Sequence, residues 1–281
     1  MHQSVSPQNL RYNNSAMPDA RRPKLGQHFL ADNRTSRRIV EALDIHRDEL
    51  VIEIGAGRGA MTGLLAERAR RVVAIELDGL LTSQLNEKFG SDPRIEVVHA
   101  DILSTDLAQL CRRWNAEKSF VFGNLPYYIT APILNHLAIY RARVRAMALV
   151  LQHEVAERLT AVPGTRDYGY LTVLVQLVSE PEILLRIPPG AFSPAPKVNS
   201  ALVYFKIRPM FLDWQEEDHE DFLQFAKHCF AQKRKNLPNN LSTAYLRRRV
   251  LQELDRLSFA PTLRAEQLTI EQLARLFQGL R

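Results

Sequence analysis

The chain has little of the chemistry that marks a disulfide-stabilised or metal-binding protein. It contains only two cysteines, Cys111 and Cys229, which lie far apart and form no Cys-x-x-Cys pair. This excludes a disulfide framework and a zinc site of the usual cysteine spacing. His153-Glu154 has no second histidine four residues after the first, so the helical zinc motif is missing as well. We therefore expect no metal, and a reducing, cytoplasmic location.

Long hydrophobic runs are also missing. No segment approaches the roughly 18 continuous apolar residues of a membrane span, and the apolar run 146–151 has only the length of a strand. Residues 1–22 are polar and lack the apolar core of a secretory signal. Three arginines in this stretch are typical of a mitochondrial presequence, but its prolines would interrupt the amphipathic helix of such a presequence. The sequence predicts a disordered tail over 1–22 and no membrane partner.

The chain has fewer negatively charged than positively charged side chains. There are 37 lysines and arginines against 31 aspartates and glutamates, which gives a formal net charge of +6 and a pI near 9.4. This balance suits a polyanionic partner such as nucleic acid. Many proteins with no such partner are equally basic, so charge alone leaves both interpretations open.

Hydrophobic runs of strand length recur along the chain with helical patterns between them. The first five runs alternate with helices, which predicts a parallel, doubly wound α/β sheet. The last two flank a proline-rich loop at 188–196 and are expected to pair antiparallel, which makes seven strands. The runs lie at 51–54, 72–75, 95–98, 119–122, 146–151, 182–187 and 201–207.

A change of pattern at Arg208-Pro209 predicts a second, smaller domain. From there to the C-terminus the apolar spacing is helical, with phenylalanines at 222, 225 and 230, a break at Pro238, and leucines further on. The predicted organisation is a tail over 1–22, a ligand-binding α/β domain over 23–208 and an all-helical domain over 209–281.

Groups suited to bind a nucleoside follow three successive strands. The first strand runs into a glycine turn containing Gly55 and Gly57, where the backbone can approach a ligand closely. The second ends in Glu76, about 20 residues further on, where a carboxylate can accept hydrogen bonds from ribose hydroxyls. Asp101 follows the third. Because parallel strands end at one edge of the sheet, these residues are expected to line one site.

The fourth strand ends in Asn124-Leu125-Pro126-Tyr127. An adenine amine is a poor nucleophile, so a site that alkylates it must offer acceptors to its N–H groups. The side-chain oxygen of Asn124 and the carbonyl of Leu125 are candidates for these acceptors. Pro126 would stiffen the turn, and Tyr127 would offer a ring face for an unstacked base. Taken alone the four residues are also typical of an ordinary turn.

Together these motifs resemble the S-adenosylmethionine-dependent ribosomal RNA adenine dimethyltransferases, the KsgA/RsmA family. The resemblance covers nearly everything from Lys24 to the C-terminus and includes a Phe-x-Pro-x-Pro-x-Val-x-Ser stretch from Phe192 to Ser200. Further matching stretches lie at 24–30, 151–155 and 230–241. The family fold is a Rossmann-like, seven-stranded class I methyltransferase domain with a smaller helical domain.

The resemblance implies a role for each matching site residue. S-adenosylmethionine would be the cofactor, and Asn124 would lie between it and the target base. His28 stands where many relatives carry asparagine. The implied cofactor contacts are His28 and Leu30 at the methionine end, Gly55 and Gly57 beside it, Glu76 at the ribose, and Asp101 at the adenine amine.

The function implied is dimethylation of N6 on two neighbouring adenosines near the 3′ end of 16S rRNA in the small ribosomal subunit. Stacking of the target base between Tyr127 and Phe192 is expected, although Phe192 is also suited to fill a core beneath its loop. The alternatives are an Erm-type enzyme that modifies large-subunit 23S rRNA, and a non-catalytic ribosome assembly or mitochondrial transcription factor of the same fold. A monomer that binds no metal is expected.

Overall fold

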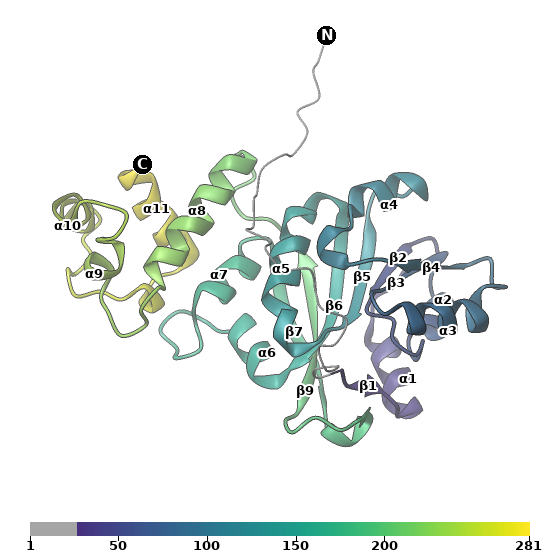
Figure 1. Cartoon of the computed structure of the whole chain (residues 1–281). Helices are drawn as coiled ribbons and strands as arrows, with labels where there is room; N and C mark the ends of the chain where they lie inside the picture. Colours follow the sequence, from purple (N-terminus) through teal and green to yellow (C-terminus); the bar gives the residue numbers. More distant parts are fainter. Residues whose placement is uncertain (1–26) are drawn as a thin grey trace, which may run out of the picture.

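A seven-stranded mixed sheet forms the centre of the molecule in the computed structural model, which describes residues 27–281 (Figure 1). The strand order is β4-β3-β2-β5-β6-β9-β7. The predicted number of strands and their approximate positions are confirmed. The strands are β2 (Leu50–Ile54), β3 (Arg71–Glu76), β4 (Ile95–His99), β5 (Ser119–Asn124), β6 (Val144–Gln152), β7 (Ser179–Ile187) and β9 (Ser200–Ile207).

Strands β2 to β6 are parallel, and β9 lies antiparallel between β6 and β7. All five residues of β2 are buried, because helices cover both faces of the sheet at its centre. The antiparallel pairing of the last two predicted strands is confirmed. The consequence for function is that β2, β3, β4 and β5 all end at the same edge of the sheet.

Helices pack on both faces of this sheet. One face packs against α4, α5 and α7, and the other packs against α1 and α2, with α3 beside β3 and β4. Hydrophobic burial on the two faces is the main stabilising contribution. The helices of this region are α1 (Asn33–Ala42), α2 (Thr62–Ala66), α3 (Gly79–Phe89), α4 (Leu107–Arg113), α5 (Thr130–Ile139), α6 (His153–Leu159) and α7 (Tyr170–Gln176).

A two-stranded sheet that the sequence patterns did not predict joins the front of the chain to the proline-rich loop. In it β1 (Phe29–Leu30) pairs antiparallel with β8 (Phe192–Ser193). Each strand has two residues, too few for any periodicity to show. We call residues 27–30 the N-terminal strap. The predicted tail over 1–22 and the start of the 24–30 stretch lie outside the described residues.

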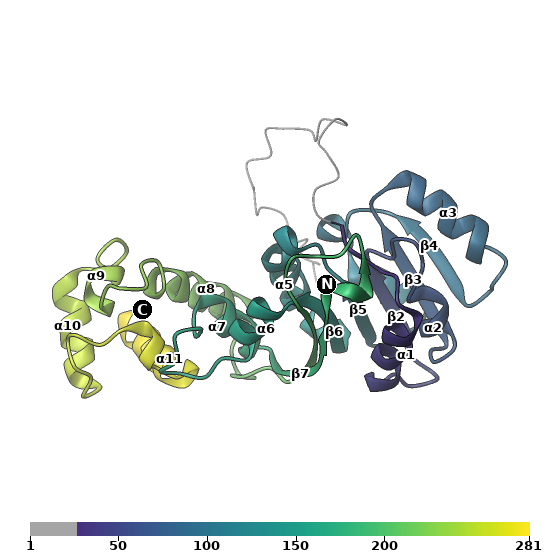
Figure 2. The same cartoon turned by 90° about the horizontal axis from the view of Figure 1, so that it is seen from below.

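The C-terminal helices gather at the end of the molecule opposite α3 and β4 (Figures 1 and 2). Pro238 is part of α9 near its N-terminus, so the predicted helix break is wrong; the chain turns earlier, at 230–236. Proline is accepted there because the first N–H groups of a helix have no helical partner. These helices are α8 (Glu216–Cys229), α9 (Leu237–Leu241), α10 (Arg247–Arg256) and α11 (Ile270–Leu280).

The helical region shares a core with the sheet region. Its buried apolar side chains belong to the same cluster as those on the α4, α5 and α7 face of the sheet. Tyr168, just before α7, packs its ring 6.0 Å from that of Phe230. The boundary at 208/209 coincides with the end of β9, but the continuous core leaves the division into two domains a prediction. None of the helices within residues 27–281 is long and apolar enough to cross a membrane.

Candidate active site

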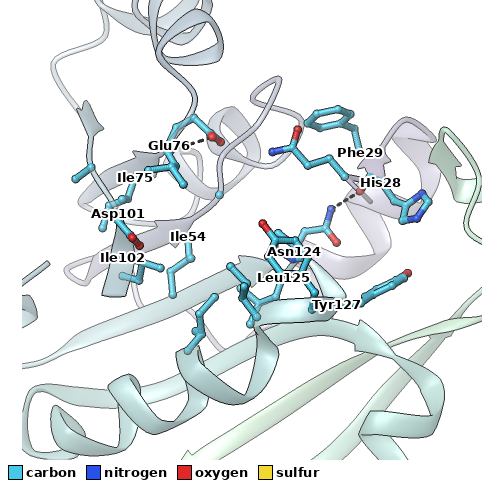
Figure 3. Close-up of a pocket in the computed structure, with 18 residues that line it drawn as sticks. His28, Phe29, Ile54, Ile75, Glu76, Asp101, Ile102, Asn124, Leu125 and Tyr127 are labelled. Carbon is cyan, nitrogen blue, oxygen red and sulfur yellow. Dashed lines mark hydrogen bonds between the residues drawn. The ribbon is translucent and has the colours of Figure 1, made fainter. Parts of the chain in front are cut away.

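A cavity of about 800 Å³, counted with its open mouth, lies at the carboxyl edge of the sheet (Figure 3). It is lined by residues at the ends of four parallel strands: Ile54 at the end of β2, Glu76 at the end of β3, Asp101 after β4, and Asn124 at the end of β5. This is where open α/β sheets bind ligands. The structure therefore brings the predicted strand-end residues together.

The glycine turn after β2 has a backbone that other residues rarely adopt. Gly55 and Gly57 have φ angles of +68° and +58°. A Cβ atom on Gly57 would lie 2.9 Å from the ring of Phe29 on the strap. Gly55 lines the cavity, whereas Gly57 does not line it and instead donates its N–H to Glu76. The turn thus leaves room for a ligand beside Gly55 and for the Phe29 ring above Gly57.

Glu76 is held by three backbone N–H groups. Its Oε2 accepts from Gly57 at 2.8 Å, and its Oε1 accepts from Leu77 and Asp78, both at 2.9 Å. A carboxylate offers about four acceptor positions, so about one is left. The prediction that this side chain accepts both ribose hydroxyls therefore requires the release of one backbone N–H when ligand binds.

Asp101 is part of a tight turn after β4. Its Oδ1 accepts from the N–H of Leu103 at 2.9 Å, and no hydrogen bond from the described residues reaches Oδ2. From α5, His136 Nε2 lies 3.0 Å from the carbonyl oxygen of Thr105 and braces this turn. Burial lowers the pKa of His136, so the ring is neutral at pH 7 and donates to that carbonyl. Because only Oδ1 of Asp101 accepts a hydrogen bond from the described residues, Oδ2 is left for a ligand.

The side-chain amide of Asn124 has a defined orientation. Its Nδ2 lies 2.9 Å from the backbone oxygen of His28 (Figure 3). Because a carbonyl oxygen only accepts, the nitrogen must face it, and Oδ1 points elsewhere. The Tyr127 hydroxyl lies 2.8 Å from Ser200 Oγ, which holds the ring at the rim of the cavity. Burial raises the pKa of Tyr127, so the phenol is neutral at physiological pH.

Two predicted site residues lie in the core instead. The Phe192 side chain is 5% exposed and packs with the cluster that contains Leu30. Phe192 does not line the larger cavity. Of its two expected placements the structure has the one in the core beneath the loop, and stacking of Phe192 on the target base stays a prediction. Its pairing with Leu30 in the β1–β8 sheet turns the ring inward. Leu30, itself 6% exposed, lines only a smaller cavity beside the glycine turn.

The sequence patterns gave no role to Glu53, which is 2% exposed on β2. Its Oε2 accepts from Thr62 Oγ1 at 2.6 Å, and burial raises the pKa of this carboxyl group to about 8. The side chain reaches the smaller cavity next to Gly55 and Asn124. A charged residue inside an otherwise apolar strand was the available signal, since such a residue is rarely buried without a reason.

S-adenosylmethionine fits the residues of the larger cavity. The glycine turn lets a ligand approach the backbone, the carboxylates of Glu76 and Asp101 offer acceptors suited to hydroxyl and amine groups, and Ile75, Leu77 and Ile102 supply apolar walls. Within residues 27–281 no group of three or more histidine, cysteine, aspartate or glutamate side chains is placed to hold a metal ion.

The strand order, the glycine turn and the acidic strand ends define a class I S-adenosylmethionine-dependent methyltransferase. The sequence model of the family described as "Ribosomal RNA adenine dimethylase" matches residues 19–281. The chain therefore belongs to the ribosomal RNA adenine dimethylase family.

Curated relatives are similar over almost the whole chain. A protein of Acidobacterium capsulatum named ribosomal RNA small subunit methyltransferase A is 43% identical over 267 residues, covering 95% of this chain and 93% of that protein. A protein of Koribacter versatilis with the same name is 40% identical and covers 93% and 95%.

Two solved structures share the fold. The 23S rRNA methyltransferase ErmE superimposes with a TM-score of 0.66 at 32% identity, covering 90% of this chain and 99% of that one. A dimethyladenosine transferase of Plasmodium falciparum superimposes with a TM-score of 0.75 over 89% and 96%, but at 22% identity it supports the fold alone.

Proposed function

We propose that this protein transfers methyl groups from S-adenosylmethionine to N6 of two adjacent adenosines near the 3′ end of 16S rRNA, in the small ribosomal subunit. Both curated relatives described above are named small-subunit enzymes and are more similar to this chain than ErmE is. A ribosomal substrate implies that the protein works in the cytoplasm. That it acts as a monomer stays a prediction.

The observation that carries the proposal is the fixed amide of Asn124. We call Gly55, Glu76 and Asp101 the cofactor wall, and Asn124 and Tyr127 the base wall. His28, the implied contact of the methionine end, lies on the strap beside Asn124. Figure 3 shows that Glu76 and Asp101 lie across the cavity from the residues of the base wall. Asn124 Oδ1 is left as an acceptor because Nδ2 donates to the strap. An adenine lying on Tyr127 would present its amine to this oxygen.

Bound S-adenosylmethionine would supply a methyl group made electrophilic by its positively charged sulfur. The contribution of the protein is then alignment and charge stabilisation. The Asn124 oxygen and the Leu125 carbonyl would accept hydrogen bonds from the amine as positive charge develops there. Stacking on Tyr127 would stabilise the unstacked base by roughly 1–3 kcal/mol. N6-methyladenine keeps one N–H, so a second transfer to the same nitrogen is chemically feasible.

Transfer of labelled methyl groups tests this proposal against its alternatives. Purified protein would be incubated with unmodified small subunits and, separately, with unmodified large subunits, and the modified bases would be mapped. We expect label on two adjacent adenines near the 3′ end of 16S rRNA only. Label on large subunits alone would support the Erm-type alternative, and no label on either would support a non-catalytic factor.

We further propose that the turn at 230–236 docks RNA. Buried Asn240 fixes this turn, since Nδ2 donates to the backbone oxygens of Cys229 and Gln232 at 2.8 and 3.1 Å. Lys233, Arg234 and Lys235 are exposed on it. The Lys233 amine donates to the backbone oxygen of Arg166, so the other two side chains are the stronger candidates for phosphate contacts.

Replacing Arg234 and Lys235 by glutamine should weaken RNA binding and flatten the dependence of log K on log salt by about 0.7 for each lost phosphate contact. Arg112 and Arg113 on α4 provide a matched control, because replacing them removes the same charge from another element. If both double variants keep the wild-type salt slope, this turn does not contact phosphate.

A further inference from the structure

Tyr128 carries an exposed aromatic ring beside the cavity. It is 69% exposed, whereas every other phenylalanine, tyrosine and tryptophan within residues 27–281 is buried or half-buried. Tyr128 directly follows Tyr127 of the base wall and lines the same cavity. Single exposed apolar residues are common on protein surfaces, but tyrosine is typical of binding surfaces because its large ring has a polar end. The exposed ring therefore lies where we propose that a base enters.

The short helix that carries Tyr128 directs its ring away from that of Tyr127. Residues Tyr127–Ile129 form a single turn of 3-10 helix. At about three residues per turn, successive side chains project about 120° apart. Ile129 packs against the apolar core, and the Tyr127 hydroxyl is held by Ser200 Oγ, so Tyr128 takes the remaining direction, toward solvent. The two tyrosine rings thus present two separate faces to a ligand.

Two other rings around the cavity are occupied by contacts within the protein. His28 Nδ1 lies 2.7 Å from the backbone oxygen of Pro194. The guanidinium of Arg58 lies over the Phe29 ring, 4.9 Å from its centroid. By contrast, no hydrogen bond or ring contact from residues 27–281 reaches Tyr128. The Tyr128 ring is therefore available to a ligand from outside the chain.

RNA is the ligand that fits this position. The carboxylates suited to the cofactor, Glu76 and Asp101, lie across the cavity from the base wall (Figure 3), and Tyr128 follows the base wall in the chain. A strand that places one base on Tyr127 must lead its next nucleotide past the rim of the cavity, because consecutive nucleotides are covalently joined. An exposed aromatic ring is a stacking platform for an unpaired base of any kind.

We propose that Tyr128 stacks on the nucleotide next to the target adenosine, so that the site holds two consecutive bases. The inference rests on the proposed function. The target base lies on Tyr127 inside the cavity, and its neighbour lies on Tyr128 at the rim. Methylation of two adjacent adenosines requires the strand to shift by one nucleotide between them, and the rim ring holds the neighbouring base during each transfer. Tyr128 contributes affinity and register for RNA and does not touch the reacting atoms.

Two substitutions of Tyr128 separate the ring face from the hydroxyl. Tyr128→Ala removes the face and should raise the KM for unmodified small subunits about tenfold, within the range for loss of one stacked base. Tyr128→Phe keeps the face and should behave as wild type. Turnover at saturating subunits should not change, because the interaction is the same before and during methyl transfer. Affinity for S-adenosylmethionine, measured by calorimetry, should not change either.

Ile139→Ala is the matched control. Ile139 is the last residue of α5 and does not line the cavity, and its side chain is 57% exposed. The substitution therefore removes exposed apolar surface without touching the rim. We expect wild-type KM and turnover in this variant.

An abasic nucleotide identifies the base that Tyr128 contacts. Small subunits would be reassembled with a 16S rRNA whose 3′ segment carries one abasic nucleotide, placed on either side of a single target adenosine. On one side, loss of the stacked neighbour should raise the KM of the wild type about tenfold. Tyr128→Ala should show no further rise on that side, because both changes remove the same interaction.

A wild-type KM in Tyr128→Ala, or a full abasic effect that persists in this variant, overturns the inference. Weaker S-adenosylmethionine binding by Tyr128→Ala would mean that the ring covers the cofactor, which overturns it as well. A wild-type protein that leaves small subunits unmethylated overturns the proposed function, and this inference with it. The two failures are distinguishable, because the Tyr128 variants are compared with an active wild type.

Discussion

On the cofactor wall, Glu76 and Asp101 are held by backbone N–H groups of nearby turns, whereas on the base wall Asn124 and Tyr127 are held by residues far along the chain. Glu76 finds two of its three donors within the next two residues, and the Asp101 donor is also two residues away. By contrast, 96 residues separate Asn124 from His28, and 73 separate Tyr127 from Ser200.

This difference predicts which substitutions should change the geometry of each wall. A wall built from its own turns keeps its geometry as long as the local backbone survives. A wall that depends on a strap loses its geometry when any of three separated segments moves. Substitutions at Ser200 should therefore affect the base wall and leave cofactor binding intact.

Asn124→Ala should break the base wall most severely. We expect turnover to fall by roughly 10²–10³, the loss typical for removal of one preorganised transition-state hydrogen-bonding group. Cofactor affinity should change little, because the acceptor is most useful when the amine becomes positive. Kinetics with saturating cofactor measure this. Asn135→Ala on α5 is the control, and wild-type turnover in Asn124→Ala would contradict the role.

Glu76→Ala should break the cofactor wall instead. Loss of a charge-assisted acceptor for a ribose hydroxyl should weaken S-adenosylmethionine binding by roughly 1.5–3 kcal/mol. The Gly57 N–H also loses its acceptor, so the glycine turn should loosen. Calorimetric titration measures the affinity, and RNA binding should survive as the internal control. Unchanged cofactor affinity would remove Glu76 from the site.

Glu53 lies on β2 beneath both walls, and its pKa of about 8, against an ordinary 4.5, makes folding depend on pH. The folded protein holds this proton more tightly than the unfolded chain. The stability it contributes is therefore complete below about pH 4.5 and is lost as the pH rises towards 8. Glu53→Gln should abolish this loss and be more stable than wild type by roughly 4–5 kcal/mol at about pH 8, since each unit of the pKa shift is worth about 1.36 kcal/mol.

Denaturant titrations at about pH 5 and about pH 8 measure this difference. Exposed Glu87 on α3 provides the control, since Glu87→Gln should not change the pH dependence. A difference between Glu53→Gln and wild type that stays constant between the two pH values would show that Glu53 is charged in the folded protein.

Ser200→Ala should give the smallest effect. It is the sharpest test of the hydrogen bond between the Tyr127 hydroxyl and Ser200, two residues that lie far apart in the sequence. It removes the hydrogen bond to the Tyr127 hydroxyl, worth about 1 kcal/mol, and should raise the KM for the ribosomal substrate several-fold. Tyr127→Phe should do the same. The double variant should be no worse than either single one, because both remove one interaction. Additive effects would show that Ser200 does not act through Tyr127.

Much of the architecture was readable from local patterns. The seven strands, the antiparallel last pair and the convergence of Gly55, Glu76, Asp101 and Asn124 on one edge follow from apolar runs and from the common ends of parallel strands. The sequence left two placements open for Phe192, because a two-residue pairing has no periodic signal that could decide between them. The roles of these residues in binding and catalysis stay predictions that the variants above test.

The sequence by itself determined the elements whose forming contacts are local: the strands, the glycine turn, and the acidic residues placed at strand ends. Only the tertiary structure decided the orientation of two side chains: which nitrogen of His28 faces the Pro194 oxygen, and which end of the Asn124 amide faces the His28 oxygen. It also decided how deeply Glu53 is buried. Hydrogen-bond orientation and desolvation depend on groups brought together from separated segments, and no spacing along the chain encodes them.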